Sequence, residues 1–135
     1  MRMKQLMGIG GLVLGSSAAM AGLVQLTPVT VTLNPDGSGS ANGSMTTARF
    51  SKNAIEFLGC GVRRIENSAG VVVTFGFCQA MTADNVNGIC NTENPELIES
   101  IGDIDDFSFI TFAWNADGVC RAIGASTQSI YILDK

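Results

Sequence analysis

Histidine is absent from this chain of 135 residues. Its absence excludes Ser-His-Asp and Cys-His catalytic groups, and also metal sites that depend on imidazole ligands. Basic residues are scarce as well, with 8 Lys and Arg against 12 Asp and Glu. Because neutralising phosphates requires clustered Lys and Arg, this balance argues against nucleic acid as a partner and against binding to anionic membranes.

Other catalytic arrangements are also missing from the sequence. Ser51 and Lys52 are adjacent, and neighbouring side chains of an extended chain point to opposite faces, so they do not form a Ser-Lys pair. Glu56 and Glu66 lie at opposite ends of one expected strand, which does not suit the paired carboxylates of a glycosidase. We therefore predict a protein that is not an enzyme and that uses no cofactor.

Charge is missing from the N-terminal region too, where no charged residue occurs between Lys4 and Asp36. Residues 1–4 are partly basic, residues 6–14 are apolar, and Ala19-Met20-Ala21 has the small-residue pattern that a signal peptidase reads. These three features in this order predict a signal peptide over residues 1–21.

Cleavage of that peptide would leave a mature chain that begins at Gly22. Six basic residues would then remain against all twelve acidic ones, a formal charge of −6. Glycines and serines interrupt the apolar run, so it does not suit an uncleaved anchor of about 20 strongly apolar residues. We expect a secreted or periplasmic protein with no stable membrane insertion after cleavage.

The most informative stretch runs from Ala54 to Met81. Two apolar runs, rich in β-branched and aromatic residues, flank residues 66–70, whose composition is that of a turn. A β-hairpin with its turn centred near Ala69 places Cys60 opposite Cys78. Both faces of this hairpin are apolar, so we expect central strands that are covered on both sides.

The cysteines are even in number, which in an exported protein predicts two disulfide bonds and allows three connectivities. The hairpin register favours Cys60–Cys78, and the second bond would then be Cys90–Cys120. The alternative pairs Cys78 with Cys90 and Cys60 with Cys120, because the loop after Cys78 can fold back.

The rest of the chain reads as short strands and turns with one helix. Asn94-Pro95-Glu96 is typical of a helix start, and Gly102 is well placed to end it. We expect a β-rich α+β domain, either one antiparallel sheet curled around the helix or a small sandwich, with two disulfides. The expected segments are an N-terminal strand in 22–33, a Gly/Ser-rich flexible linker at 34–47 and a disulfide-bonded core at 48–135. Within that core we expect a polar loop at 82–94, a hairpin of 107–114 and 119–123, and a final strand at 129–133.

One acidic cluster deserves comparison with a calcium site. Asp103, Asp105 and Asp106 follow the expected helix, and oxygen-rich loops suit Ca²⁺. The spacing does not match a full calcium-binding loop, and solvated turns explain these residues more simply. We therefore assign no metal site.

Four residues are candidates for a partner surface. Arg63 is expected opposite Phe75, where a cation–π contact can form, or it could join Arg49 in a small anion site. Trp114 and Tyr131 belong to a C-terminal third that is rich in aromatic residues, which are used both in cores and at interfaces.

A pattern of motifs spans nearly the whole mature chain. It consists of Ala48-Arg49-x-Ser51, Leu58-Gly59-Cys60, Cys78, Cys90, Phe112-x-Trp114-x-x-x-Gly118-x-Cys120 and Ser129-x-Tyr131. In this pattern the chain resembles small, uncharacterised secreted four-cysteine proteins of Gram-negative bacteria. The resemblance implies a compartment and a fold but no activity, so no catalytic residue is carried over.

Two classes of function fit these observations. The first is a non-catalytic binding or structural module of the envelope or extracellular space, with an unknown protein partner. The alternative is a small secreted effector or inhibitor that acts as a monomer. An enzyme is a third class, behind these two. An assembly module would form concentration-dependent oligomers and an effector would be a monomer, and we expect a monomer in dilute solution rather than an oligomer formed by exchange of the N-terminal strand.

Overall fold

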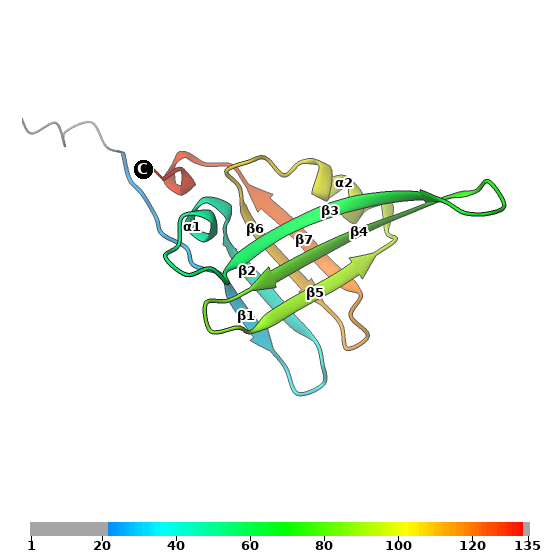
Figure 1. The fold of residues 1–135 in the computed structure, drawn as a ribbon, viewed down its shortest axis with the longest axis horizontal. Helices are drawn as coiled ribbons and strands as arrows, with labels where there is room; N and C mark the ends of the chain where they lie inside the picture. The colour runs from blue at the N-terminus through cyan, green and yellow to red at the C-terminus, as the bar shows by residue number, and fades with distance from the viewer. Residues whose placement is uncertain (1–21, 134–135) are drawn as a thin grey trace, which may run out of the picture.

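The computed structural model describes residues 22–133, so the signal-peptide prediction for residues 1–21 lies outside the described residues. Two antiparallel sheets hold most of the regular secondary structure, and one lies in front of the other in Figure 1. This arrangement confirms the predicted β-rich α+β class, in its two-sheet form. None of the helices in residues 22–133 is long and apolar enough to span a membrane.

The larger sheet has four strands in the order β1-β2-β6-β7. The smaller sheet has three strands in the order β3-β4-β5. The strands are β1 (Thr30–Leu33), β2 (Gly39–Ser44), β3 (Phe57–Glu66), β4 (Val72–Met81), β5 (Asn87–Thr92), β6 (Phe109–Trp114) and β7 (Cys120–Ser126). Helices α1 (Met45–Arg49) and α2 (Pro95–Gly102) and the 3-10 helix η2 (Ser129–Tyr131) complete the fold.

The core lies between the two sheets. Ile110, Phe112 and Trp114 of β6 are buried against Cys78 and Cys90 of the three-stranded sheet. These residues alternate along their strands, so each sheet turns one face inward.

The predicted disulfides and hairpin register are confirmed. Cys60 pairs with Cys78 in the β3–β4 register, and their sulfurs are bonded. Cys90 of β5 is bonded to Cys120 of β7, which joins the two sheets covalently.

The expected cover on both sides of the hairpin is wrong. Strand β3 pairs only with β4, so it is an edge strand, and only one face of the three-stranded sheet packs on the core. In the described part of the chain, two sheet layers are present and no third layer covers this sheet, as Figure 1 shows.

The predicted flexible linker is also wrong in its centre. Residues 39–44 form β2, which lies between β1 and β6 and is largely buried. Its side chains are small because larger neighbours occupy the space: a Cβ added at Gly39 would lie 2.5 Å from Cζ2 of Trp114. Ser44 then caps α1 by accepting a hydrogen bond from the Thr47 N–H.

Helix α2 agrees with the prediction in its start and its end. The Asn94 side chain accepts hydrogen bonds from the N–H groups of Glu96 at 2.9 Å and Leu97 at 3.3 Å. The loop expected at 82–94 contains β5, and the strand expected at 129–133 is instead η2. Tyr131 of η2 is buried and stacks on Phe109 with ring centroids 5.4 Å apart, which holds this segment on the core.

Candidate binding surface

The three-stranded sheet turns an apolar face to solvent. Because the buried residues of β4 and β5 point to the core, the residues between them point outward. Phe57 is 40% exposed, Ile89 is 48% exposed and Ile65 is 55% exposed. We call this surface the outer face, and its apolar residues are Phe57, Ile65, Val73, Phe75, Phe77, Met81 and Ile89.

Two glycines of β3 flatten this outer face. A Cβ added at Gly61 would lie 2.8 Å from Cζ of Phe77, so the Phe77 ring covers the glycine. A Cβ added at Gly59 would meet nothing within 4 Å, which leaves open space beside the exposed Phe57. The outer face is therefore flat along β3 and largely apolar, and its uncharged polar residues are Gln79, Asn87 and Asn91.

Arg63 supplies the one positive charge of the outer face. Its Cζ lies 4.9 Å from the ring centroid of Phe77, close enough for a cation–π interaction. Arg63 pairs with Phe75 in the register, as expected. The prediction that its cation–π contact is with the Phe75 ring was wrong. The guanidinium reaches the diagonal neighbour Phe77 on the same face instead, since long side chains of one sheet face contact diagonal neighbours.

The β3–β4 hairpin extends beyond the rest of the sheet. Strand β5 pairs with residues 76–81 of β4 only, whereas β3 pairs with all of 72–81. The outer half of the hairpin therefore projects from the body of the molecule, at the right of Figure 1. Ile65, Val71 and Val72 near its tip are exposed.

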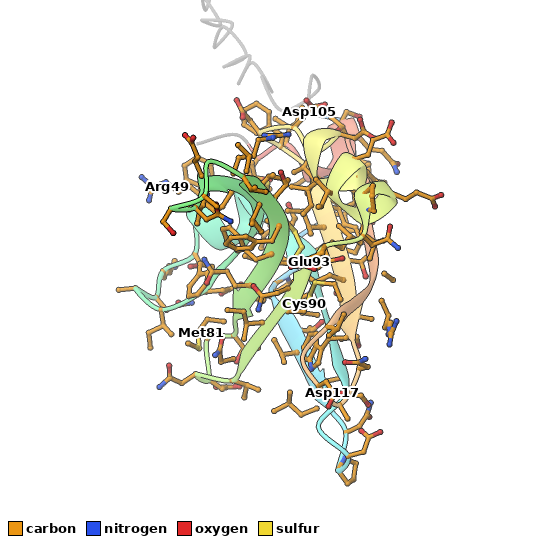
Figure 2. The ribbon with its side chains drawn as sticks, turned by 90° about the vertical axis from the view of Figure 1, so that its right-hand side faces the viewer. Arg49, Met81, Cys90, Glu93, Asp105 and Asp117 are labelled. Carbon is orange, nitrogen blue, oxygen red and sulfur yellow. A yellow bond between two sulfur atoms is a disulfide. The ribbon has the colours of Figure 1, made fainter. Side chains whose placement is uncertain are left out.

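A notch lies where β5 ends and the hairpin continues. It contains a hollow of about 380 Å³ lined by Phe75, Asn91, Thr92, Glu93 and Val119. An adjoining hollow of about 340 Å³ shares Thr92, Glu93 and Val119 and adds Asn94, Glu96, Leu97, Cys120 and Arg121. We call these two hollows together the notch. Figure 2 looks at the molecule from the side toward which the hairpin projects and shows Glu93 just beyond Cys90 of β5.

A separate hollow of about 360 Å³ lies between α1 and the start of β3, and Arg49 and Glu56 are among its lining residues. The Glu56 carboxylate accepts hydrogen bonds from the Val29 N–H at 2.9 Å and from Nδ2 of Asn53 at 3.0 Å. Glu56 therefore has a structural task, because it ties the N-terminal segment to the loop before β3.

The structure separates the predicted partner-surface residues. Trp114 is 6% exposed and Tyr131 is 9% exposed, so both belong to the core and their prediction as surface residues is wrong. Arg49 is exposed at the end of α1, and Arg63 is exposed on the outer face. Of the four, only Arg63 lies on the apolar surface described above.

Sequence reasoning missed Ile89 and Glu93, because both lie in the segment expected to be a polar loop. The alternation of buried Gly88, Cys90 and Thr92 with exposed neighbours is the period-two pattern of a strand. The cysteine within that alternation is the signal that could have identified β5.

The acidic residues of the described chain are not gathered into a metal-binding cluster. Among residues 22–133, no three carboxylate or thiol side chains come together in a way that could hold a metal ion. Asp105 accepts a hydrogen bond from Thr127 Oγ1 at 3.3 Å. The pKa of Asp36 lies below its ordinary value because Ser38 donates side-chain and backbone hydrogen bonds to its carboxylate.

No protein-family model, no curated protein and no solved structure matches this chain.

Proposed function

We propose that this protein is an exported, non-catalytic binding module of the envelope or the extracellular space, and that its outer face holds a protein partner. The observation that carries the proposal is the row of exposed apolar residues across all three strands of one sheet. Monomeric soluble proteins rarely expose a contiguous apolar area of this kind unless another molecule covers it.

The rigidity of the surface supports the same function. One disulfide joins the two strands of the hairpin, and the other joins β5 to the opposite sheet. A surface that is ordered before binding loses less conformational entropy when the partner arrives. Disulfides also persist in oxidising compartments, which supports a location outside the cytoplasm.

A secreted effector or inhibitor is the second candidate, and the projecting hairpin favours it. Ile65, Val71 and Val72 near the tip are exposed, and the tip stands clear of the body, so it could enter a cleft of a target. In that case the tip would carry most of the binding energy and the flat centre of the outer face would contribute little.

Site-specific photo-crosslinking in the producing organism tests the proposal. A benzophenone amino acid at Phe57 or Ile89 should give one defined protein adduct, whereas the same group at Thr111, exposed on the opposite sheet, should give none. Adding Ile89→Arg to the Phe57 crosslinking variant should abolish the adduct, because a buried unpaired charge opposes association. Equal labelling from Thr111 would refute the outer-face proposal. A third variant carries the benzophenone group at Val72, near the tip of the hairpin. Adducts from that variant alone would also refute the outer face and would favour the effector.

A further inference from the structure

At the notch, strand β4 has backbone N–H and C=O groups that pair with no other strand of the described chain. The Asn67 N–H donates to the Val71 carbonyl at 2.8 Å, which fixes the alternation of hydrogen-bonded pairs along the hairpin. By that alternation, the N–H and C=O groups of Val72, Thr74 and Gly76 point away from β3. Those of Gly76 face its partner Thr92 on β5.

Val72 and Thr74 lie beyond the end of β5. Within residues 22–133, β4 pairs with β5 only as far as Gly76, so the two N–H and two C=O groups of these residues have no strand beside them. A strand edge of this kind is a template for another extended chain. The chain itself turns away at Glu93 to enter α2, which leaves the line of β5 vacant beside β4.

The notch adds side-chain recognition on both sides of that line. On the outer side, Phe75 and Val119 give the first hollow apolar walls. On the inner side, Glu96 and Leu97 at the start of α2 line the second hollow. A strand beside β4 would point alternate side chains into these two hollows, because side chains alternate across a strand.

Charge distinguishes the two hollows. Glu93 lies at the border of both hollows and Glu96 borders the inner one, while Arg121 is the one basic residue among the described lining residues. The negative charge continues along α2 with Glu99, which does not line the notch. Two carboxylates against the one guanidinium of Arg121 leave the inner hollow net negative, so a positively charged side chain suits it, and an apolar side chain suits the outer hollow.

We propose that the notch binds an extended polypeptide segment of the partner, which adds to β4 as a fourth strand at Val72 and Thr74. An apolar residue of that segment lies opposite Phe75 in the outer hollow, and a neighbouring Lys or Arg lies opposite Thr74 near Glu93 and Glu96. Backbone hydrogen bonds give affinity and the alternating side chains give selectivity, as in other cases of strand addition. The inference rests on the proposed binding function, since Phe75 belongs both to the outer face and to the notch.

The test uses the full mature chain with both disulfides and a fluorescent hexapeptide of alternating valine and lysine as the probe. We expect binding that weakens with added salt and is lost when the lysines are replaced by glutamate. The variant Glu93→Gln/Glu96→Gln should bind about fivefold more weakly. Glu99→Gln is the matched control and should leave the affinity unchanged.

Amide hydrogen exchange provides the direct readout of strand addition. In the free protein, the amides of Val72 and Thr74 should exchange fast, and those of Val73 and Phe75, which face β3, should be protected. The peptide should protect Val72 and Thr74, and a peptide with N-methylated backbone amides should not. Binding without this protection, or equal binding of the glutamate peptide, would refute the inference.

Two further outcomes are informative. Protection of Val72 and Thr74 that rises with protein concentration, without peptide, would identify a second copy of the chain as the occupant and would overturn the proposal of a partner segment. Absence of peptide binding together with a defined adduct from Phe57 or Ile89 would refute the notch and leave the proposed function standing. Peptide protection without any outer-face adduct would refute the outer face alone.

Discussion

The indole ring of Trp114 lies directly over Gly88 of the facing sheet. A Cβ added at Gly88 would come within 2.6 Å of Cη2 of Trp114. The same ring covers Gly39 of its own sheet, and its Nε1 donates a hydrogen bond to the Gly37 carbonyl at 3.2 Å. One side chain thus sets the distance between the two layers near this end of the sandwich.

We expect Gly88→Ala to lower the free energy of unfolding by about 1–3 kcal/mol, because the added methyl group overpacks the contact with Trp114. Gly59→Ala is the matched control, since the space above Gly59 is open. That control should change the stability by less than about 0.5 kcal/mol. Urea denaturation monitored by Trp114 fluorescence measures both, and equal losses in the two variants would contradict the packing argument.

Local turn chemistry explains which parts of this fold were predictable. The turn residues expected at 66–70 and 115–118 separate apolar runs, and the turns of the β3–β4 and β6–β7 hairpins form there, at 67–71 and 115–119. Gly70 and Gly118 adopt φ of +77° and +75°. Asn94 and Pro95 define the start of α2 in the same local way. The disulfides followed because the register of the first hairpin placed Cys60 beside Cys78.

The unpredicted parts depend on distant neighbours. Strand β2 has no large side chain of its own, and its burial comes from Trp114 and Val29, which occupy the space over Gly39 and Gly43. Likewise, an apolar strand face looks the same in sequence whether a layer covers it or not. The number of layers is a property of the whole chain, so the open outer face could be recognised only in the structure.

The two disulfides should differ in their contribution to stability. Cys90–Cys120 closes a separation of 30 residues and Cys60–Cys78 one of 18. The chain-entropy model gives about 3.6 and about 3.2 kcal/mol for these loops, a difference of less than about 0.5 kcal/mol. We expect the double variant Cys90→Ala/Cys120→Ala to be destabilised more than Cys60→Ala/Cys78→Ala. A second reason is that Cys90 and Cys120 are both buried, so their replacement also removes packing between the sheets. Calorimetry of the two double variants decides the order, and a larger loss for the hairpin bond would contradict this reasoning.

Arg63 should stabilise the hairpin through the ring of Phe77. We expect Arg63→Ala to cost about 0.5–1 kcal/mol, and Arg63→Lys to cost less, because a cation over an exposed ring contributes in this range. Arg64→Ala is the control, since Arg64 leaves the opposite face of β3. Urea midpoints give the energies, and ring-current shifts of the Arg63 side-chain protons report the contact. Their absence from the proton spectrum would show that the contact does not persist in solution.

The turn between β1 and β2 contains a titratable group with a lowered pKa. Ser38 Oγ donates to the Asp36 carboxylate at 2.6 Å and the Ser38 N–H donates to it at 2.9 Å. A lowered pKa in the folded state means that this contribution to stability is present above the ordinary value of 3.8 and is lost as the pH falls through the folded-state value. Ser38→Ala should raise the pKa of Asp36 toward 3.8, as measured by NMR titration of its carboxyl carbon. An unchanged titration curve would assign the shift to the backbone bond alone.

The N-terminal segment should stay with its own chain, so that the chain from Gly22 onward is a monomer in dilute solution. Strand β1 is joined to β2 by a turn in which the Asn34 N–H donates to the Ser38 carbonyl at 2.9 Å, so no flexible tether separates the two strands. The Gln25 N–H donates to the Ile130 carbonyl at 2.8 Å, and the side chain of Val29 is buried. Exchange between chains would have to open this turn and withdraw Val29 from the core. Dilution also disfavours association, so the exchanged dimer should not form in dilute solution.

Size-exclusion chromatography with light scattering, across a hundredfold dilution, tests this expectation. The mass should stay that of one chain throughout. Deleting residues 22–34 should expose the edge of β2 and the space left by Val29, so the truncated protein should aggregate or unfold, because an unprotected strand edge pairs with other chains. A stable dimer of the chain from Gly22 onward that becomes a folded monomer after this deletion would show that β1 pairs between chains instead.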